Sequence, residues 1–374
     1  MGELTLQKIE LVEIDMPLKH SFETSFGVTT GRRVILVRAI DNYGNTGYGE
    51  CTAMERPFYN PESVDPAWQL IIKTIAPMLA AAGVRTAADV IDVLSPIKGN
   101  RMSIAAVETA IWDLEAKSRD IPLHKILGGS RGEISCGVSI GIQANTEALL
   151  EKVAKEIDAG YQRIKIKIKP GKDVDLVEAV RKVYPDILLS VDANSAYELE
   201  RDLDVMLALD EYGLLMIEQP LTAGDILDHA KLQQKLRTSI CLDESITCLR
   251  DARQAIEIDA CRIINIKLGR VGGHSQAREI QEFAHSKGVP VWCGGMLETG
   301  IGRAHNIAMS TLPGFVLPGD VSASARYWKE DIVEPPVEVS SRGTIEAPSG
   351  TGIGYTVRES EIERLASRSF SIEL

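Results

Sequence analysis

The sequence predicts an α/β fold, a (β/α)7-8 barrel of the TIM type preceded by a smaller α+β region. After residue 132, short apolar segments alternate with amphipathic stretches, and the apolar segments recur about every 25 residues. Repeated strand–helix units imply right-handed crossovers and a parallel sheet. The alternative is an open doubly wound sheet, but no Gly-x-Gly-x-x-Gly motif follows an early strand. We therefore expect the strands to close into a barrel.

The α+β region is expected over residues 1–128. Segments 6–16 and 33–51 have the pattern of strands, and a turn at 42–45 folds the second into a hairpin. From 65 to 129 the apolar residues recur three and four apart, and the segment closes at a glycine pair where a helix would end. No cluster of catalytic residue types stands out in this region.

The barrel is expected over residues 129–335. The remaining segment, 336–374, is expected to return and pack on the N-terminal region. The candidate strands of the barrel are the segments 135–142, 163–168, 187–194, 214–220, 239–245, 262–268, 289–295 and a short one at 315–320.

Composition and charge exclude several classes of protein. The chain has 374 residues and a formal net charge of −12, which argues against nucleic acid or anionic membrane as a partner. No run approaches the roughly 20 apolar residues of a membrane span, and the first residues lack the basic start and apolar core of a signal peptide. The six cysteines are scattered without a Cys-x-x-Cys pair. We therefore expect a cytoplasmic protein with reduced thiols.

Charged residues stand near the ends of five successive candidate strands: Lys167, Asp192, Glu218, Asp243 and Lys267. Barrel enzymes place their chemistry at the C-terminal ends of the strands, where such residues converge. Each acid alone could be a helix cap or a loop residue. Buried carboxylates are normally paired or bound to metal, however, because an unpaired buried charge is costly. Three acids in phase therefore predict a site for a hard cation, Mg²⁺ rather than Zn²⁺, since no Cys or His accompanies them.

Lysine alternates with isoleucine over residues 163–169, which puts Lys165, Lys167 and Lys169 on one face of a strand. A lysine-rich face can simply protect the edge of a sheet, and Lys169 is expected past the strand end, in solvent. With acids at the neighbouring strand ends, we expect Lys167 and Lys267 to face a substrate from opposite sides of the barrel mouth. Near a divalent cation and another ammonium, the pKa of a lysine falls from ~10.4 toward neutrality. Such a pair suits removal of a proton next to a carboxylate, because a metal stabilises the enediolate that forms.

Five motifs carry a resemblance to a known family: KIKIKPG, VDAN, IEQP, LDES and NIKLGRVGG. They resemble the muconate-lactonizing subgroup of the enolase superfamily, and the similarity runs over nearly the whole chain. The stretch Trp292–Ser324 resembles the branch that contains o-succinylbenzoate synthases and N-acylamino acid (N-succinylamino acid) racemases. The resemblance implies that the N-terminal region caps the barrel and that Mg²⁺, with Mn²⁺ or Co²⁺ as substitutes, is bound by Asp192, Glu218 and Asp243. It makes the two strand-end lysines the acid–base pair.

The resemblance also implies a reaction. A carbon–oxygen lyase of menaquinone biosynthesis would dehydrate 2-succinyl-6-hydroxy-2,4-cyclohexadiene-1-carboxylate to o-succinylbenzoate, and the same site would racemise N-succinylamino acids. The alternatives are a dedicated N-acylamino acid racemase, a muconate-type cycloisomerase, a dipeptide epimerase and a non-catalytic binder. Dipeptide epimerases of the superfamily carry an Asp-x-Asp pair near the last strand, where this sequence has Asp320-Val321-Ser322. The partners implied are a small carboxylate substrate and further copies of the chain, as a dimer or octamer.

Three further residues are candidates for contact with the substrate. Gly295 and Met296 follow a strand, where nearby backbone N–H groups would receive an anionic tail; they could also form only a tight turn. Lys165 lies two residues before Lys167 on the same face. It would either lower the pKa of Lys167 further or bind a carboxylate of the substrate.

The resemblance adds contact residues that the pattern alone does not give. Ser139 and Asn194 match substrate-contact positions of this branch, although either could satisfy backbone groups instead. The segment His20–Gly27, with Phe22 and Phe26, resembles a mobile loop that closes over the substrate and excludes water. The two phenylalanines fit the core of the N-terminal region equally well.

Overall fold

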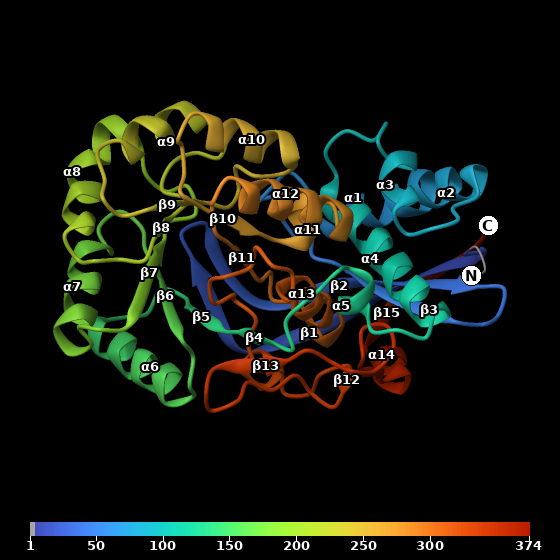
Figure 1. Cartoon of the computed structure of the whole chain (residues 1–374). Helices are drawn as coiled ribbons and strands as arrows, with labels where there is room; N and C mark the ends of the chain where they lie inside the picture. The colour runs from blue at the N-terminus through green and yellow to red at the C-terminus, as the bar shows by residue number, and fades with distance from the viewer. Residues whose placement is uncertain (1–3) are drawn as a thin grey trace.

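The computed structural model describes residues 4–374, with an antiparallel sheet beside a curled parallel sheet (Figure 1). The antiparallel sheet has the order β15-β1-β2-β3, so the last strand of the chain pairs with the first. Asp41 holds the predicted turn between β2 and β3, because its carboxylate accepts hydrogen bonds from the backbone N–H groups of Tyr43 and Asn45. The strands are β1 (Leu6–Thr24), β2 (Gly27–Asp41), β3 (Thr46–Cys51) and β15 (Ala366–Glu373).

Most of the stretch between the two predicted N-terminal strands is also strand. β1 and β2 form one long hairpin that reaches the mouth of the barrel (Figure 1). The pairing is interrupted between Pro17 and Phe22, since proline gives no N–H to a ladder, and it resumes at Phe22↔Thr29. The connection at His20–Gly27 is therefore a strand hairpin rather than an irregular loop. β-branched and aromatic residues on both sides of the turn favour this extension.

The helical region predicted between residues 65 and 129 is confirmed. Its longest helix, α4, is buried on nearly all sides, because it lies between the antiparallel sheet and the barrel. Gly47 in β3 permits this packing, since a Cβ at that position would lie 2.1 Å from the carbonyl oxygen of Ala110 in α4. The elements are α1 (Val64–Leu70), the π-helical turn η1 (Ile71–Ile75), α2 (Ala76–Ala82), α3 (Asp89–Val93), α4 (Arg101–Ser118) and α5 (Leu123–Ile126).

Seven parallel strands form the curled sheet in the order β11-β10-β9-β8-β7-β6-β5, which confirms the predicted TIM-type architecture. The eighth candidate, residues 315–320, forms only single parallel bridges, Val291↔Phe315 and Cys136↔Gly319, and these join the two edges of the sheet. Pro318 limits its pairing because it has no N–H. The strands are β5 (Gly137–Ile140), β6 (Arg163–Lys167), β7 (Leu188–Asp192), β8 (Ile217–Glu218), β9 (Ile240–Leu242), β10 (Ile263–Ile266) and β11 (Val291–Cys293).

Helices cover the outside of the curled sheet (Figure 1). They alternate with the strands along the chain, as right-handed crossovers require. The first of them is capped by Asn145, whose side chain accepts a hydrogen bond from the N–H of Ala148. They are α6 (Thr146–Asp158), α7 (Val174–Val183), α8 (Leu199–Asp210), α9 (Ile226–Gln233), α10 (Leu249–Glu257), α11 (Leu268–Val271), α12 (His274–Ser286) and α13 (Gly300–Ser310).

The last part of the chain contacts both sheets. β13 pairs with β4 at the start of the barrel, β12 pairs with β14, and β15 pairs with β1. The division of the chain at residues 128 and 335 stays a prediction. The elements are β4 (Glu133–Ser135), the 3₁₀ turn η2 (Ser324–Arg326), β12 (Val333–Glu334), β13 (Thr344–Glu346), β14 (Thr356–Val357) and α14 (Glu359–Leu365).

Two general features of the described residues concern membrane spans and cysteines. No helix within residues 4–374 has both the length and the apolar character needed to cross a membrane. All six cysteines are free thiols, and all but Cys248 are buried. Their scatter through the core is that of small apolar side chains rather than of a disulfide framework.

Candidate active site

The lysine-bearing face of β6 lies inside the barrel. Arg163, Lys165 and Lys167 alternate with isoleucines along the strand, and only 2% of Lys165 and 7% of Lys167 is exposed. Deeper in the barrel, the guanidinium of Arg163 and the ammonium of Lys165 lie 4.7 and 4.8 Å from the ring centre of Trp292. This face is therefore the wall of an interior site and not a solvated edge of the sheet.

Three carboxylates stand at neighbouring strand ends beside these lysines. Asp192 ends β7, Glu218 ends β8 and Asp243 follows β9, and all three are fully buried. Asp192 and Glu218 are direct partners in the parallel register, so their side chains leave the sheet side by side. The structure thus brings together the acids that the sequence spacing put in phase.

Nitrogen donors engage these carboxylates. Lys165 Nζ lies 2.7 Å from Glu218 Oε2 and 3.1 Å from Asp192 Oδ2. Lys167 Nζ lies 2.5 Å from Asp192 Oδ2 and 2.6 Å from Asn194 Oδ1. With the ammonium groups placed between them, no three acidic, histidine or cysteine side chains within residues 4–374 converge closely enough to hold a metal ion.

The backbone at these strand ends is strained. Asn194, Ser195 and Gln219 all have positive φ, at 42°, 62° and 36°, which residues other than glycine rarely adopt. The side chain of Gln219 accepts hydrogen bonds from the backbone N–H groups of Asp243, at 2.9 Å, and Ser245, at 3.2 Å, and so ties the end of β8 to the end of β9. Such strain persists only where the surroundings fix it, and it is typical of functional sites.

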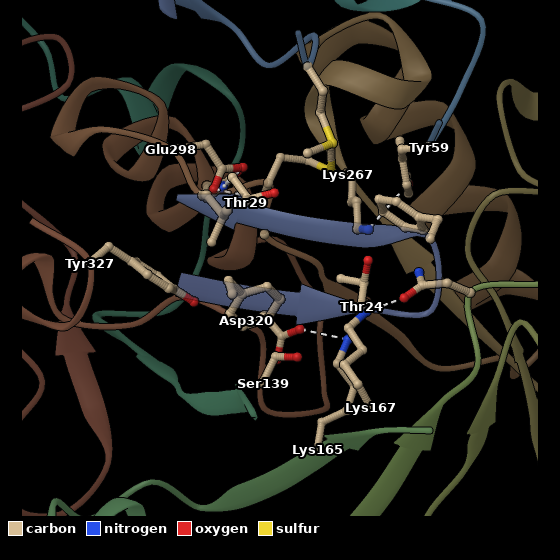
Figure 2. A pocket seen from close by; sticks show the side chains of 18 of the residues that line it. Thr24, Thr29, Tyr59, Ser139, Lys165, Lys167, Lys267, Glu298, Asp320 and Tyr327 are labelled. Atoms are coloured by element: carbon tan, nitrogen blue, oxygen red, sulfur yellow. Dashed lines mark hydrogen bonds and ion pairs between the residues drawn. The ribbon is translucent and has the colours of Figure 1, made fainter. Parts of the chain in front are cut away.

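Lys267 follows β10 on the opposite side of the pocket. Its Nζ lies 2.7 Å from Asp243 Oδ2 and 3.2 Å from the hydroxyl of Tyr59. Tyr59 also donates to Asp243 Oδ1 at 3.1 Å, and Arg270 binds the same carboxylate. Figure 2 shows Lys167 and Lys267 entering the pocket from opposite walls.

The two lysines differ in their electrostatic surroundings. Burial, the larger effect, lowers the pKa of Lys167 below its usual value, although Asp192 opposes the shift. Burial acts in the same direction on Lys267, but Tyr59 and Glu244, with carboxylates farther away, outweigh it and raise its pKa. This arrangement favours loss of a proton from Lys167 over loss from Lys267.

One pocket brings the predicted substrate contacts together. Phe22 and Phe26 are half-buried and form part of its wall, so they are not packed away in the core. The three carboxylates lie beside the lysines and do not line the pocket themselves in this arrangement. The pocket is lined by both catalytic candidates and by every predicted contact residue: Lys167, Lys267, Lys165, Ser139, Asn194, Gly295, Met296, Phe22 and Phe26.

The pocket has further walls that the sequence reasoning did not assign to it. Two of them could have been found from their positions in the sequence. Asp320 ends the eighth candidate strand, and Glu298 lies shortly after the seventh. The others come from the hairpin, the loop after β3, the connection from β11 to α13, α13 itself and the segment after η2. The residues are Thr24, Thr29, Met54, Tyr59, Leu297, Glu298, Arg303, Asn306, Asp320 and Tyr327.

Asp320 is neutralised by two buried cations. Arg163 Nη2 lies 2.6 Å from one carboxylate oxygen, and Lys165 Nζ lies 2.7 Å from the other. Burial, the largest effect, opposes ionisation, but the two cations outweigh it and hold the pKa of Asp320 below its usual range. Both oxygens of this acid are therefore already committed to cations.

The tip of the β1–β2 hairpin rests on the mouth of the barrel. The N–H of Ile142 donates to the carbonyl oxygen of Glu23 at 2.9 Å, and Lys169 Nζ lies 3.1 Å from the carboxylate of Glu23. Gly141 permits the contact, because a Cβ there would lie 2.9 Å from the same carbonyl oxygen. The prediction that Lys169 is simply solvated is corrected, since it is only about one third exposed (34%) and is ion-paired.

The fold and this arrangement of residues define a class of enzyme. Residues 8–128 match the family model described as the mandelate racemase / muconate lactonizing enzyme N-terminal domain, and residues 148–361 match the model described as enolase C-terminal domain-like. The chain belongs to the enolase superfamily. Members of this superfamily generally use a divalent metal.

Individual members of the superfamily are similar to this chain over nearly their whole length. An o-succinylbenzoate synthase of Geobacillus kaustophilus is 48% identical over 361 residues, which cover 96% of each chain. An N-succinylamino acid racemase of Thermus thermophilus is 44% identical over 362 residues, covering 97% of each. The crystal structure of an enolase-superfamily member from Listeria innocua superposes with a TM-score of 0.95 at 43% identity, covering 99% of each chain.

Proposed function

We propose that this protein is an o-succinylbenzoate synthase that also racemises N-succinylamino acids. The observation that carries the proposal is the pair of lysines, Lys167 and Lys267, which enter one pocket from opposite walls beside three buried carboxylates. Relatives that bear the two names align over nearly the whole chain at 43–48% identity. Both reactions begin with removal of a proton next to a carboxylate, so one set of residues serves both.

We propose Mg²⁺ as the cofactor, held by Asp192, Glu218 and Asp243. The donor set fits a hard cation, because it consists of carboxylate oxygens without sulfur or imidazole. On the same wall, Glu244 Oε2 is buried without a hydrogen-bond partner in the described part of the chain, which leaves an acceptor to spare. A bound divalent cation would supply Lewis-acid stabilisation of the charge that develops on the substrate carboxylate.

The chain's own residues would move the protons. Lys167 is proposed as the base that takes the α-proton and, in the dehydration, protonates the departing hydroxide. Asp192 and Asn194 both bind its Nζ, so they fix where the amine points. Lys267 would remain a cation on the opposite face during dehydration. During racemisation it would deliver a proton from that face, and transfer on opposite faces inverts the configuration.

We propose that Lys165 supports the site and does not bind the substrate. Its ammonium lies 2.7 Å from Glu218, 2.7 Å from Asp320 and 3.1 Å from Asp192, which uses the three donors that it has. Its positive charge would balance the carboxylate oxygens of these acids that do not bind the metal. Contact with the substrate is assigned to the other predicted pocket residues: Ser139, Asn194, Gly295, Met296, Phe22 and Phe26.

A dedicated racemase is the second candidate, and one observation favours it. A lyase of this kind needs a base on one face only, whereas a racemase needs a proton-carrying group on each face, and both Lys167 and Lys267 line the pocket. A dipeptide epimerase is less well supported. The carboxylate of Asp320 is already shared by two cations, and position 322 is a serine with no charge to hold a peptide ammonium.

We further propose a cytoplasmic location and a homo-oligomeric state. The six free thiols support the location, because reduced cysteines persist in that compartment. Size-exclusion chromatography with light scattering tests the assembly directly. A mass near 40.8 kDa at micromolar concentration would contradict an oligomer.

Isotope exchange tests the proposed function. Wild type, Lys167→Ala, Lys267→Ala and the control Lys169→Ala, just beyond the end of β6, are incubated with N-succinylamino acids in deuterium oxide with Mg²⁺, and the dehydration is followed in parallel. We expect wild type to exchange the α-proton and to form o-succinylbenzoate, and the control to do both at rates within about fivefold of wild type. Each site variant should lose racemisation. A wild type that binds Mg²⁺ but performs neither reaction contradicts the substrate assignment.

A further inference from the structure

The turn between β11 and α13 is held in a strained shape. We call residues 294–299 the β11–α13 turn, and its residues Gly295 to Glu298 line the pocket. Leu297 in its centre has a φ of 57°, in the left-handed region where a side chain with a Cβ is disfavoured. Hydrogen bonds to the backbone of the turn must therefore fix this conformation.

Arg32 reaches the turn from β2 of the antiparallel sheet. Its Nη1 donates to the carbonyl oxygen of Met296, and its Nη2 donates to the carbonyl oxygens of Thr52 and Ala53 at 3.1 and 3.0 Å. The side chain is buried, with 3% of the residue exposed. One guanidinium thus joins β2, the segment after β3 and the wall of the pocket.

Glu298 contacts the same residue, Met296, at its backbone N–H. One oxygen of its carboxylate accepts a hydrogen bond from the N–H of Met296 at 2.8 Å, and the other accepts from the side chain of Asn306 at 2.9 Å. Met296 is therefore bound at its N–H by Glu298 and at its carbonyl by Arg32. These two contacts determine the path of the chain into Leu297.

The partners of Arg32 are unusual for a buried guanidinium. Within residues 4–374 its hydrogen bonds go to backbone carbonyls, whereas a buried arginine is normally paired with a carboxylate. Glu50 and Glu298 stabilise its charge through space without taking its donors. The donors of Arg32 are thus free to hold backbone.

We infer that Arg32 is a positioning residue, which sets the shape of the β11–α13 turn and thereby the affinity of the pocket for the acyl substrate. The inference rests on the proposed function only for the choice of substrate. Arg32 does not line the pocket, so it acts through the carbonyl of Met296. None of the hydrogen bonds described for its guanidinium goes to Lys167 or Lys267, so we expect the proton-transfer step to depend on it little.

Steady-state kinetics test the inference with N-succinylamino acids as the probe. We expect Arg32→Met to raise KM about tenfold while kcat changes less than about threefold, because the loss affects binding more than proton transfer. Arg32→Lys keeps the charge with a different donor geometry and should raise KM less. The matched control is Arg33→Met on the same strand, whose guanidinium pairs with Glu13 and Asp65 instead; it should leave KM unchanged.

Leu297→Gly separates positioning from a general loss of stability. Glycine adopts the left-handed conformation without strain, so the turn should depend less on its tether. We expect the rise in KM caused by Arg32→Met to shrink by at least about threefold in the Leu297→Gly background. Effects that simply multiply, or a folded Arg32→Met with unchanged KM, overturn the inference. If Arg32→Met does not fold by circular dichroism, Arg32→Lys takes its place in the same cycle.

Hydrogen exchange gives an answer that does not depend on turnover. Amides in the β11–α13 turn should exchange about tenfold faster in Arg32→Lys or Arg32→Met than in wild type, with no such change in Arg33→Met. Unchanged exchange in the turn overturns the inference. A wild type without turnover on the substrates, together with faster exchange in the Arg32 variants, contradicts the proposed function and leaves the positioning role of Arg32 standing.

Discussion

Two groups of buried charges differ in how they are satisfied: those in the barrel mouth and those where the N-terminal region meets the barrel. In the mouth, charge faces charge, with lysines against Asp192, Glu218 and Asp243. At the interface, carboxylates accept backbone N–H groups at the starts of helices. From the N-terminal region, Glu108 caps α12 and Glu50 caps α13 of the barrel. Glu62 caps α4 in the same way within the N-terminal region itself.

The two arrangements suit two different roles of buried charge, exchange of ions and protons on the one hand and fixation of structure on the other. The backbone N–H groups at the start of a helix are held in place by the helix itself. A carboxylate that accepts hydrogen bonds from them is therefore held in one position, and it holds the helix in return. A lysine ammonium can swing away, accept an ion in its place or lose a proton. The mouth is therefore suited to exchange of ions and protons, and the interface is suited to holding the N-terminal region against the barrel.

Removing divalent metal should break function at the mouth without breaking the fold. Because each proposed metal-binding acid has a cationic partner, Lys165, Lys167 or Lys267, chelation should not leave unpaired buried charges. We expect dialysis against a chelator to lower activity by at least about a hundredfold and Mg²⁺ to restore it. Circular dichroism and activity, measured on the same samples, check this. Unfolding of the chelated protein would contradict the proposed exchange.

The interface should respond in the opposite way to loss of one carboxylate. Glu108 accepts hydrogen bonds from the N–H groups of His274 and Ser275, each at 2.8 Å, and from the side chain of Trp112. Glu108→Ala removes the partner of both backbone N–H groups, whereas the indole N–H of Trp112 keeps Ser275 Oγ at 3.3 Å. We therefore expect the free energy of unfolding to fall by about 3 kcal/mol. Urea unfolding measures it.

The control for that variant lies on the helix that Glu108 caps. Glu279 in α12 is exposed, and its carboxylate contacts only Gln276 among the hydrogen-bond partners described. Glu279→Ala should change stability by less than about 0.5 kcal/mol. An equal fall in the free energy of unfolding in the two variants would show that the Glu108 cap of α12 does not stabilise the fold more than an exposed glutamate does.

The residues of the barrel mouth could be predicted from the sequence, whereas those that reach the site from the N-terminal region could not. Lys167, Asp192, Glu218, Asp243 and Lys267 each sit at the end of a short apolar run, and the spacing of the runs sets their phase around a barrel. Local pattern therefore sufficed to bring them together. The eighth strand was also located, although its proline reduces it to two bridges.

Arg32 and Tyr59 could not be predicted in this way. Each lies in the N-terminal region and reaches the site only because that region docks on the barrel. Arg32 and Arg33 are adjacent arginines in the sequence, and only the direction of each side chain from β2 decides which one meets the turn and which one meets surface acids. Nothing in residue type distinguishes the two.

The pH dependence of stability sharpens the description of the interface. Burial, the largest effect, raises the pKa of Glu108 to about 7, although the hydrogen bonds from Ser275 and His274 oppose it. Between the usual glutamate pKa of 4.5 and about 7, the folded protein binds a proton here that the unfolded chain releases. The contribution of Glu108 is thus fully present below that window and declines as pH rises through it, by about 2 kcal/mol between pH 5 and 7.

Comparison with Glu108→Gln isolates this contribution. The variant lacks the titrating group, so the difference between wild type and variant should decline by that amount from pH 5 to 7 in urea unfolding. Burial lowers the pKa of His274 instead, which makes its contribution to stability rise with pH through about 6.5. Both proteins contain His274, so the comparison cancels its effect. A difference that is flat over this range would contradict a raised pKa at Glu108.

The tip of the β1–β2 hairpin has an ion pair that belongs neither to the buried charges of the barrel mouth nor to those of the interface. Its loss should have the smallest effect of the changes proposed. Glu23 and Lys169 form an ion pair that is about one third exposed on each side, so solvent screens it, and exposed pairs contribute about 0.2–1 kcal/mol. Because the pair ties the hairpin to the strand end beyond Lys167, Lys169→Met should lower kcat/KM by about two- to fivefold without changing the melting temperature. High salt should abolish the difference between wild type and variant, whereas a loss that persists in salt would mean that Lys169 acts on the substrate itself.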